Sequence, residues 1–594
     1  MRRALLLICL VACSSETPQA PAPQPAPKPR PPAEALEKGR PIEKELVAGH
    51  VDRYKVTLKA NDVLLATVDQ RGIDVVVTVL DPSDKRIAEL DSPNGQKGPE
   101  PIVVEAKRAG EYRIEISAFM PPPGDVAPPS AGLESAGKYE ARIDEILTSR
   151  AYVERQMKES IDSSRMFELW KAVRDRQPKA VEKFWTELKG KSPLVEPVAG
   201  DANEVLITFA YRDKKTPYVA LIGGPSFREK PLQHLAGTDV WYLTARMPAD
   251  SRFAYAFLPT NAPPEYMSVF RLRPDRPNPR VTKKVLDPNN PKRFADMSYA
   301  ELPAAPPQPW IGETPGTPAG TVKELTIDSS EMKEPRKVAV YTPSGYDPKL
   351  TYPLIIAFDG EAYGIGPGPL IPLPRILDNL IAAKKIAPTV AVLVANQGTR
   401  NRDLTASEPF SRFVALELVP RMRNEFRAGM TPAQTLLTGS SYGGLCAAFT
   451  ALQHPTVFGS VLSNSGAFGY RQGEAERPLP IYEERGWLIR KFVTSPKQPI
   501  RFYLDAGRFE TDGGPGDLLS ENRRMRDVLE AKGYQVTYAE FSGGHDYQVW
   551  RGTIADGLMA LMPAKPAPAT PAARGTAAAQ APAAAQPPEP PPTE

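Results

Sequence analysis

Residues 435–449 read TLLTGSSYGGLCAAF. A short apolar run, Thr435 to Leu437, has the character of a buried strand, and a second apolar run with helical character begins at Leu445. Between them stands the pentad Gly439-Ser440-Ser441-Tyr442-Gly443. A serine on a sharp strand-to-helix turn needs small neighbours where strand and helix converge, and this is the context of a nucleophile elbow. The stretch therefore predicts that Ser441 is a catalytic nucleophile.

The order of residues along the chain strengthens this prediction. A Gly-x-Ser-x-Gly pentad alone would occur by composition in roughly one chain of this size in five. The chain has four histidines, and three of them lie in β-rich regions or at an expected helix end. His545 follows a strand-like run, on the glycine-rich loop Ser542 to Asp546. Nucleophile, acid and then histidine is the order of an α/β-hydrolase, so His545 is the predicted general base.

The acid of the triad is expected on the loop after the strand-like run Arg501 to Leu504. Three carboxylates follow that run, Asp505, Glu510 and Asp512. The task of the acid is to orient the histidine and to compensate its charge. Asp505 stands at the strand end, which is early for this role. Glu510 is therefore preferred, with Asp512 as the alternative acid.

The oxyanion hole requires two hydrogen-bond donors. The backbone amide of Tyr442, directly after the nucleophile, is expected to supply the first. The second should come from the loop after the strand-like run Leu354 to Phe358, where Gly360 lets the backbone turn back toward the serine, and Glu361 is the predicted donor. This chemistry requires no metal and no cofactor.

The rest of the chain predicts a multidomain protein. From Tyr352 onward strand-like and helix-like runs alternate, which indicates a mostly parallel sheet with helices on both faces, whereas two regions before it are rich in short strands. The expected order is a signal peptide (1–12), a Pro-rich linker (13–38), a β-sandwich accessory domain (39–147), a connector of two helices (148–190), a second β-sandwich (191–302), a Pro-rich linker (303–320), the α/β-hydrolase domain (321–562) and a disordered Pro/Ala-rich tail (563–594).

The N-terminus predicts export. Two arginines precede an apolar stretch, residues 4–12, that is too short to span a bilayer. Leu10-Val11-Ala12-Cys13 resembles the lipobox of bacterial lipoproteins, which implies that Cys13 carries a lipid anchor. The expected location is the cell envelope, on the periplasmic side or at the outer membrane. A plain secretory signal is the alternative.

Charge and cysteine usage exclude further classes. The formal net charge of +4 on 594 residues predicts no nucleic-acid partner. Removal of the signal deletes Cys9, and lipidation would consume Cys13, so Cys446 is the only thiol left and no intrachain disulfide is possible. Cys446 is interpreted as a buried packing residue. The oligomeric state stays open.

Several motifs together resemble the enterochelin (ferric enterobactin) esterases, over roughly residues 184–561. They are FDGE (358–361), GSSYGG (439–444), LSNSG (462–466) and GGHD (543–546), with LAGTDVW (235–241) and DPNNP (287–291) in the middle domain. In that family the middle sandwich helps to cover the substrate. The first sandwich resembles an accessory module found beside secreted bacterial peptidases and other exported enzymes.

The resemblance implies hydrolysis of the ester bonds of a serine trilactone siderophore, which releases iron held by catecholates. Such a ferric complex is anionic, so Arg400 and Arg402, in the loop after a central strand, are candidates to bind the substrate. A lipid anchor and an extra sandwich depart from the cytoplasmic members of the family. Two alternatives therefore stay open, a carbohydrate or feruloyl esterase of the cell envelope and a catalytically idle lipoprotein that binds a ligand.

Overall fold

The computed structural model describes residues 32–119, 136–226, 228–261, 283–472, 485–511 and 517–564. The chain forms two compact units, Met1–Ile161 and Asp162–Glu594. The predicted signal sequence with Cys13, the alternative acid Asp512 and nearly all of the predicted tail lie outside the described residues.

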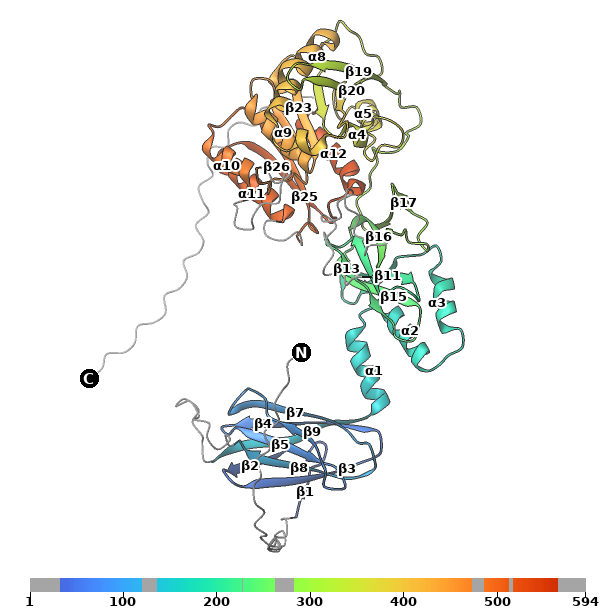
Figure 1. Ribbon diagram of the computed structural model, residues 1–594, viewed down its shortest axis with the longest axis vertical. Coiled ribbons are helices and arrows are strands. Elements are labelled where there is room, and N and C mark those ends of the chain that lie inside the picture. Colours follow the sequence, from blue (N-terminus) through green and yellow to red (C-terminus); the bar gives the residue numbers. More distant parts are fainter. Residues whose placement is uncertain are drawn as a thin grey trace, which may run out of the picture. The chain divides into compact units, whose positions relative to one another are not determined.

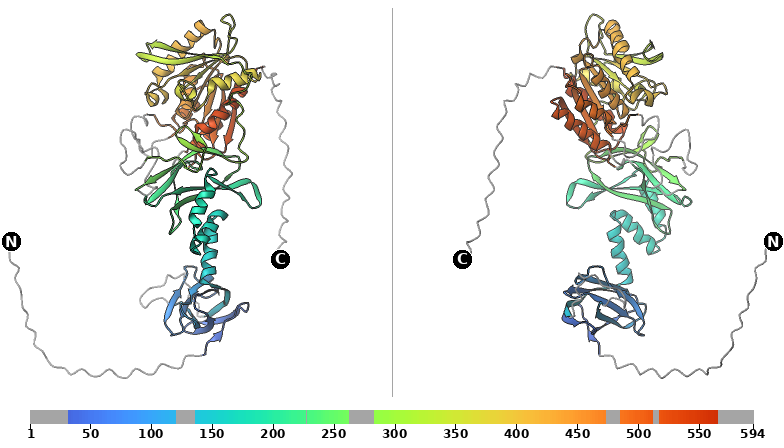
Figure 2. Two further views of the ribbon diagram at one scale, coloured as in Figure 1. Left: turned by 90° about the vertical axis from the view of Figure 1, so that its right-hand side faces the viewer. Right: turned by 60° about the vertical axis from the view of Figure 1, so that its left-hand side comes forward.

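The first unit is a β-sandwich followed by one helix. Its two sheets have the strand orders β1-β3-β8-β5-β6 and β2-β9-β4-β7, and both views of Figure 2 show the blue strands in two layers. Tyr112, Ile114 and Ile116 alternate with more exposed residues along β8 and are buried in the core, as expected for a strand with one face turned inward. The elements are β1 (Glu34–Ala35), β2 (Ile42–Val47), β3 (Val51–Leu58), β4 (Asp62–Arg71), β5 (Val75–Leu80), β6 (Arg86–Leu90), β7 (Lys97–Glu105), β8 (Gly110–Ala118), β9 (Ala136–Thr148) and α1 (Ser149–Ser160).

Three helices lie where the sequence predicted two. They are α1, α2 (Ser164–Arg174) and α3 (Ala180–Leu188). The helix α1 ends before Ile161, and the hydroxyl of Ser163 accepts a hydrogen bond from the Met166 N–H and caps the start of α2. A serine at this position favours a new helix start over continuation of the previous helix, and the hydrophobic spacing alone did not reveal this.

A second sandwich follows α3. Its sheets have the orders β10-β11-β15-β14 and β13-β12-β16-β18-β17. A strand with one face in solvent buries alternate residues, yet every residue of β16 is buried, which shows that both faces of this strand are covered. The strands are β10 (Leu194–Val198), β11 (Asp201–Arg212), β12 (Tyr218–Gly223), β13 (Lys230–Pro231), β14 (Gln233–His234), β15 (Val240–Pro248), β16 (Arg252–Thr260), β17 (Arg293–Phe294) and β18 (Met297–Glu301).

The catalytic domain is built on an eight-stranded sheet of order β19-β20-β22-β21-β23-β24-β25-β26. The pairs β19–β20 and β20–β22 are antiparallel. The six strands β22, β21, β23, β24, β25 and β26 run parallel to one another. The strands are β19 (Thr321–Ser329), β20 (Glu334–Thr342), β21 (Leu354–Ala357), β22 (Val390–Val394), β23 (Thr435–Ser440), β24 (Ser460–Asn464), β25 (Arg501–Gly507) and β26 (Gln535–Phe541). The predicted mostly parallel sheet is confirmed.

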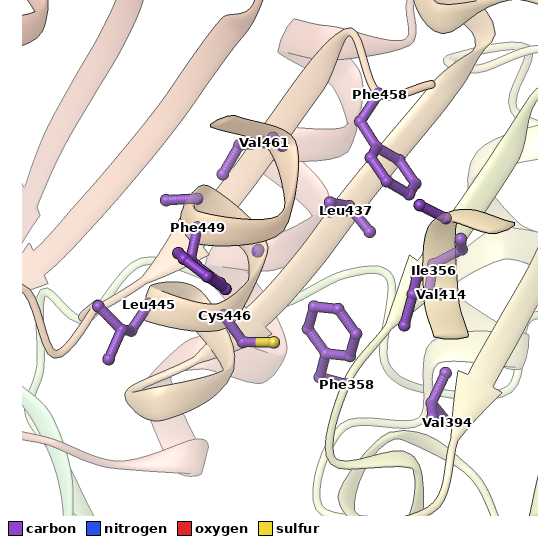
Figure 3. Close-up of a cluster of buried hydrophobic side chains, with 14 of the residues drawn as sticks. Ile356, Phe358, Val394, Val414, Leu437, Leu445, Cys446, Phe449, Phe458 and Val461 are labelled. Atoms are coloured by element: carbon purple, nitrogen blue, oxygen red, sulfur yellow. The ribbon is translucent and has the colours of Figure 1, made fainter. Parts of the chain in front are cut away.

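Helices cover both faces of this sheet (Figure 1). Neighbouring residues of β23 point to opposite sides, so Leu436 packs with α5 and α12 whereas Leu437 packs with α8 through α11. On the second side Cys446 lies among apolar side chains that include Phe358 and Phe449 (Figure 3). The helices are α4 (Gly360–Tyr363), α5 (Leu373–Ala382), α6 (Arg400–Leu404), α7 (Glu408–Arg412), a π-helical turn (Phe413–Leu418), α8 (Val419–Phe426), a 3-10 turn (Pro432–Gln434), α9 (Tyr442–Gln453), α10 (Trp487–Thr494), α11 (Leu518–Ala531) and α12 (Tyr547–Leu561).

The Pro-rich segment 303–320 has no helix or strand, yet it packs on the catalytic domain. Trp310 and Ile311 lie against the core beneath α5 and α12, and the Asn379 side chain donates hydrogen bonds to the carbonyl oxygens of Trp310 and Gly312. In the part of the chain that the structure describes, no helix has both the length and the apolar character required to cross a membrane.

Candidate active site

The turn at Ser441 has the geometry of a nucleophile elbow. Ser441 joins β23 to α9 with φ 59° and ψ −120°, a conformation that L side chains rarely adopt. Its N–H donates to the carbonyl of Asn464, and its own carbonyl accepts from Leu445 and Ala467. A Cβ atom on Gly439 would lie 2.6 Å from the backbone of Gly443, so glycine is required where β23 and α9 meet. The surrounding hydrogen bonds therefore hold the serine in a strained and fixed position.

Glu510 and His545 meet above the carboxyl ends of β25 and β26. Oε1 of Glu510 lies 3.4 Å from Nδ1 of His545, and the glutamate is fully buried whereas the imidazole remains 19% exposed. Ser441 follows the end of β23 in the same parallel sheet. Because the carboxyl ends of parallel strands share one edge, all three candidate triad residues lie at that edge.

The loops that carry the acid and the histidine are joined by their backbones. Arg508 donates its N–H to the carbonyl of Phe541, and Phe509 donates to the carbonyl of Gly543. A Cβ atom on Gly507 would collide with the Gly543 carbonyl, so glycine permits this close approach. The distance between Glu510 and His545 is therefore set by direct contact of the two loops.

The two predicted oxyanion donors both lie at helix starts. Tyr442 is the first residue of α9, and Glu361 lies in the first turn of the single-turn helix α4. The first N–H groups of a helix have no intrahelical acceptor and project outward at its N-terminal end. The side chain of Glu361 accepts hydrogen bonds from the Asn396 and Gln397 N–H groups, which ties α4 to the loop after β22.

Arg400 is bound to a buried carboxylate behind the elbow. Asp359 is 2% exposed and receives two hydrogen bonds from Arg400, at 2.6 and 2.9 Å, and a third from the Asn396 side chain at 2.8 Å. Burial alone would lower the pKa of the Arg400 guanidinium, but Asp359 raises it above its usual value. The Arg400 guanidinium also lies 5.8 Å from the centre of the Tyr442 ring. Arg400 therefore fixes the turn before Glu361, and 33% of its side chain is exposed.

Arg402 faces a different cluster. It forms ion pairs with Glu334 and with Asp403, and Asp403 is also paired with the fully buried Arg336 at 2.8 Å. The structure thus brings Ser441, Tyr442, Glu361, His545, Glu510 and Arg400 to one edge of the sheet, whereas the contacts of Arg402 are with β20 and α6.

Asp505 lies within β25, five residues before Glu510. It is fully buried, and its Oδ2 accepts a hydrogen bond of 2.7 Å from the Asn464 side chain. Burial raises the pKa of Asp505 to about 7, and the nearby Glu510 carboxylate adds to this shift. Asp505 is therefore a carboxyl group that gains its charge only near neutral pH.

A cavity of about 350 Å³ opens beside His545. The catalytic domain contributes Gly544 to Tyr547 and Leu370 to its wall, and the second sandwich contributes residues from β12, β16 and β17. Phe253, Phe294 and Met297 make the lining largely apolar, and Lys284 adds a positive charge paired with Asp296. We name this space the histidine cavity. It gives a small aromatic or aliphatic group access to the imidazole.

The fold and the site define a carboxylic ester hydrolase of the α/β-hydrolase class. Residues 329–561 match the family model described as "Putative esterase", and residues 206–311 match "Enterochelin esterase, N-terminal". The two matches cover the middle sandwich and the catalytic domain, the two regions in which the sequence motifs resemble the enterochelin esterases.

Known esterases are similar to this chain over its middle and catalytic domains. The iron(III) enterobactin esterase of Dickeya dadantii is 29% identical over 422 residues, which cover 65% of this chain and 94% of that protein. The iron(III) enterobactin esterase of Escherichia coli K12 is 28% identical over 56% of this chain and 81% of its own length. The crystal structure of the Shigella flexneri enterobactin esterase in the presence of enterobactin has a TM-score of 0.50 and 25% identity, covering 64% of this chain and 97% of that one.

Replacement of Glu510 by Gln tests its role as the acid. An amide cannot compensate an imidazolium charge and favours the wrong tautomer of His545, so we expect kcat to fall on the order of 10³- to 10⁴-fold. The measurement is steady-state hydrolysis of a p-nitrophenyl ester. Glu521→Gln is the matched control, because Glu521 is a buried glutamate of α11 that is 3.8 Å from Arg524. A kcat of Glu510→Gln that equals the kcat of the parent would exclude Glu510 as the acid.

Asp505→Asn tests the buried carboxyl group. Its pKa is raised from 3.8 to about 7, so the folded state binds more protons than the unfolded state between these values, and stability falls as pH rises through this window. The variant should therefore gain stability relative to the parent from pH 5 to pH 8, as measured by urea unfolding. Asp527→Asn, at a side chain that is 62% exposed, should show no such gain. A pH-independent difference between Asp505→Asn and the parent would contradict the assignment.

Proposed function

We propose that this protein hydrolyses the ester bonds of a catecholate siderophore of the serine trilactone class. The observation that carries the proposal is the histidine cavity, which is shared by the catalytic loop and by the sandwich that matches the enterochelin esterase N-terminal model. Its aromatic and apolar lining fits a catechol ring, and the exposed part of Arg400 suits an anionic ferric complex. The enterobactin esterases among its relatives support the same substrate class.

In the proposed mechanism Ser441 forms an acyl-enzyme. Nδ1 of His545 faces Glu510, which leaves Nε2 to take the proton of the Ser441 hydroxyl as the oxygen attacks the ester carbonyl. The N–H groups of Tyr442 and Glu361 stabilise the resulting oxyanion. Collapse breaks the C–O bond of the ester, and the imidazolium gives its proton to the departing alkoxide oxygen of the lactone, which leaves as a hydroxyl. Water then attacks the acyl-enzyme by the same route and restores Ser441.

The substrate prediction is tested with a protein that begins at Ala33, alongside its Ser441→Ala variant. We expect enterobactin, with and without iron, to be opened to linear products, detected by chromatography and mass spectrometry, and the variant to be inactive. Methyl ferulate and a p-nitrophenyl ester are the comparison substrates. Turnover of ferulate without turnover of the trilactone would replace the siderophore by a plant-polymer ester. Absence of Ser441-dependent turnover with every ester would contradict the catalytic proposal.

We also propose that the protein is an exported lipoprotein anchored through Cys13. The support is the sequence Leu10-Val11-Ala12-Cys13 at the end of an apolar stretch, followed by a Pro-rich tract. Expression of the full chain in a Gram-negative host should give a membrane-associated protein whose first residue is a lipid-modified Cys13, as measured by mass spectrometry. Cys13→Ser should lack the lipid. An unmodified N-terminus at any other residue would contradict the anchor.

A further inference from the structure

The loop that carries His545 is held by the second sandwich as well as by its own domain. Arg252, the first residue of β16, donates its N–H to the carbonyl of Ser542 at 3.1 Å. Two residues further along β16, the N–H of Ala254 donates to Oδ2 of Asp546. These two contacts bracket the segment Gly543 to His545, and a Cβ atom on Gly543 would lie only 2.9 Å from the Arg252 carbonyl.

Asp546 joins the two domains with one carboxylate. Its side chain is partly buried, and Oδ1 accepts the Gln548 N–H at 2.8 Å, which caps the start of α12. Oδ2 accepts the Ala254 N–H of the sandwich. The carbonyl of Ala254 is occupied by the Gly224 N–H at 2.9 Å, so the position of this strand is itself fixed within the sandwich.

The imidazole of His545 depends on the same elements. Its ring packs edge-on against Trp550 of α12 at 4.7 Å between ring centres, and the Trp550 N–H donates to the Ser465 hydroxyl at 3.0 Å. Asp546 sets where α12 begins and where the backbone of His545 lies. A displacement of β16 would therefore move both the backbone of the histidine and the surface on which its ring rests.

We infer that Asp546 is a positioning residue through which the second sandwich orients His545 for catalysis. The sandwich is then a structural part of the catalytic unit, in addition to being a wall of the histidine cavity. This inference rests on the proposed function of His545 as the base. It assigns to Asp546 a link to the Ala254 N–H that is distinct from its role as the cap of α12.

The variant Asp546→Ser separates the contact with the Ala254 N–H from the capping of α12. Serine is a favourable N-cap residue, so Asp546→Ser retains a cap for α12. Its side chain is shorter than that of aspartate and has a single oxygen, so it cannot also accept from Ala254. Asparagine has the length of aspartate and one acceptor oxygen, and it preserves part of the link. Asp517→Ser is the matched control, because Asp517 caps α11 by accepting the Ser520 N–H at 2.7 Å and its contacts lie within the catalytic domain.

The experiment measures kcat and KM for p-nitrophenyl acetate, together with the thermal unfolding midpoint, in the protein that begins at Ala33. Because misplacement of a catalytic group by about 1 Å costs on the order of 100-fold, we expect Asp546→Ser to lower kcat by about 10- to 100-fold with KM within about twofold. Asp546→Asn should lie between this variant and the parent, and Asp517→Ser should retain the parent kcat. The unfolding midpoints of the two serine variants should agree.

Two results would overturn the inference. One is a parent-like kcat in both Asp546→Ser and Asp546→Asn. The other is a lower kcat and a lower unfolding midpoint in Asp546→Ser together with a parent-like kcat in Asp546→Asn. Loss of the helix cap alone would explain that pattern. If the parent itself lacks Ser441-dependent turnover, the proposed function fails first. The two failures are therefore distinguishable.

Discussion

The backbone of Ser441 adopts φ 59° and ψ −120°, and the geometry of the site is organised around keeping it there. Hydrogen bonds from Ser441 to Asn464 and from Leu445 and Ala467 to Ser441 fix the turn from three directions. The same turn sets the start of α9 and hence the direction of the Tyr442 amide. A strained turn persists only where the surroundings over-determine it, and here the parallel strand β24 and the core beneath α9 supply those surroundings.

Four carboxyl groups at the edge of the sheet differ in their hydrogen-bond and ion-pair partners. Asp359 has a bidentate arginine and fixes a turn. Asp505 has an asparagine, and burial raises its pKa to about 7. Asp546 accepts two backbone N–H groups, and Glu510 faces an imidazole. Among these groups Glu510 is the one whose carboxylate lies 3.4 Å from the His545 imidazole. Chemical type and sequence position alone do not make this distinction.

The sequence revealed the parts of the site that depend on local order. The Gly-x-Ser-x-Gly pentad between strand and helix located the elbow, and chain order selected His545. The sequence missed β24 as a strand, because Ser460, Ser463 and Asn464 are polar and are buried only through their neighbours in the sheet. It assigned no role to Asp359 or Asp546, since the Arg400 partner is 41 residues away and the Ala254 partner is 292 residues away. Contacts between residues so far apart in the chain leave no local pattern in the sequence. The position of Asp359 directly after a buried strand was nevertheless a signal that could have been used.

The strand β16 links the second sandwich to the catalytic domain through its backbone. Movement of this strand away from the catalytic domain would break its hydrogen bonds to Ser542 and Asp546 of the histidine loop. The histidine cavity is formed by the same strand and the same loop, so a ligand in that cavity contacts both sides of the contact that positions His545. The lining of the cavity and the contacts of the histidine loop therefore share residues. A ligand that binds more tightly to the ordered arrangement of these residues stabilises that arrangement by its differential affinity.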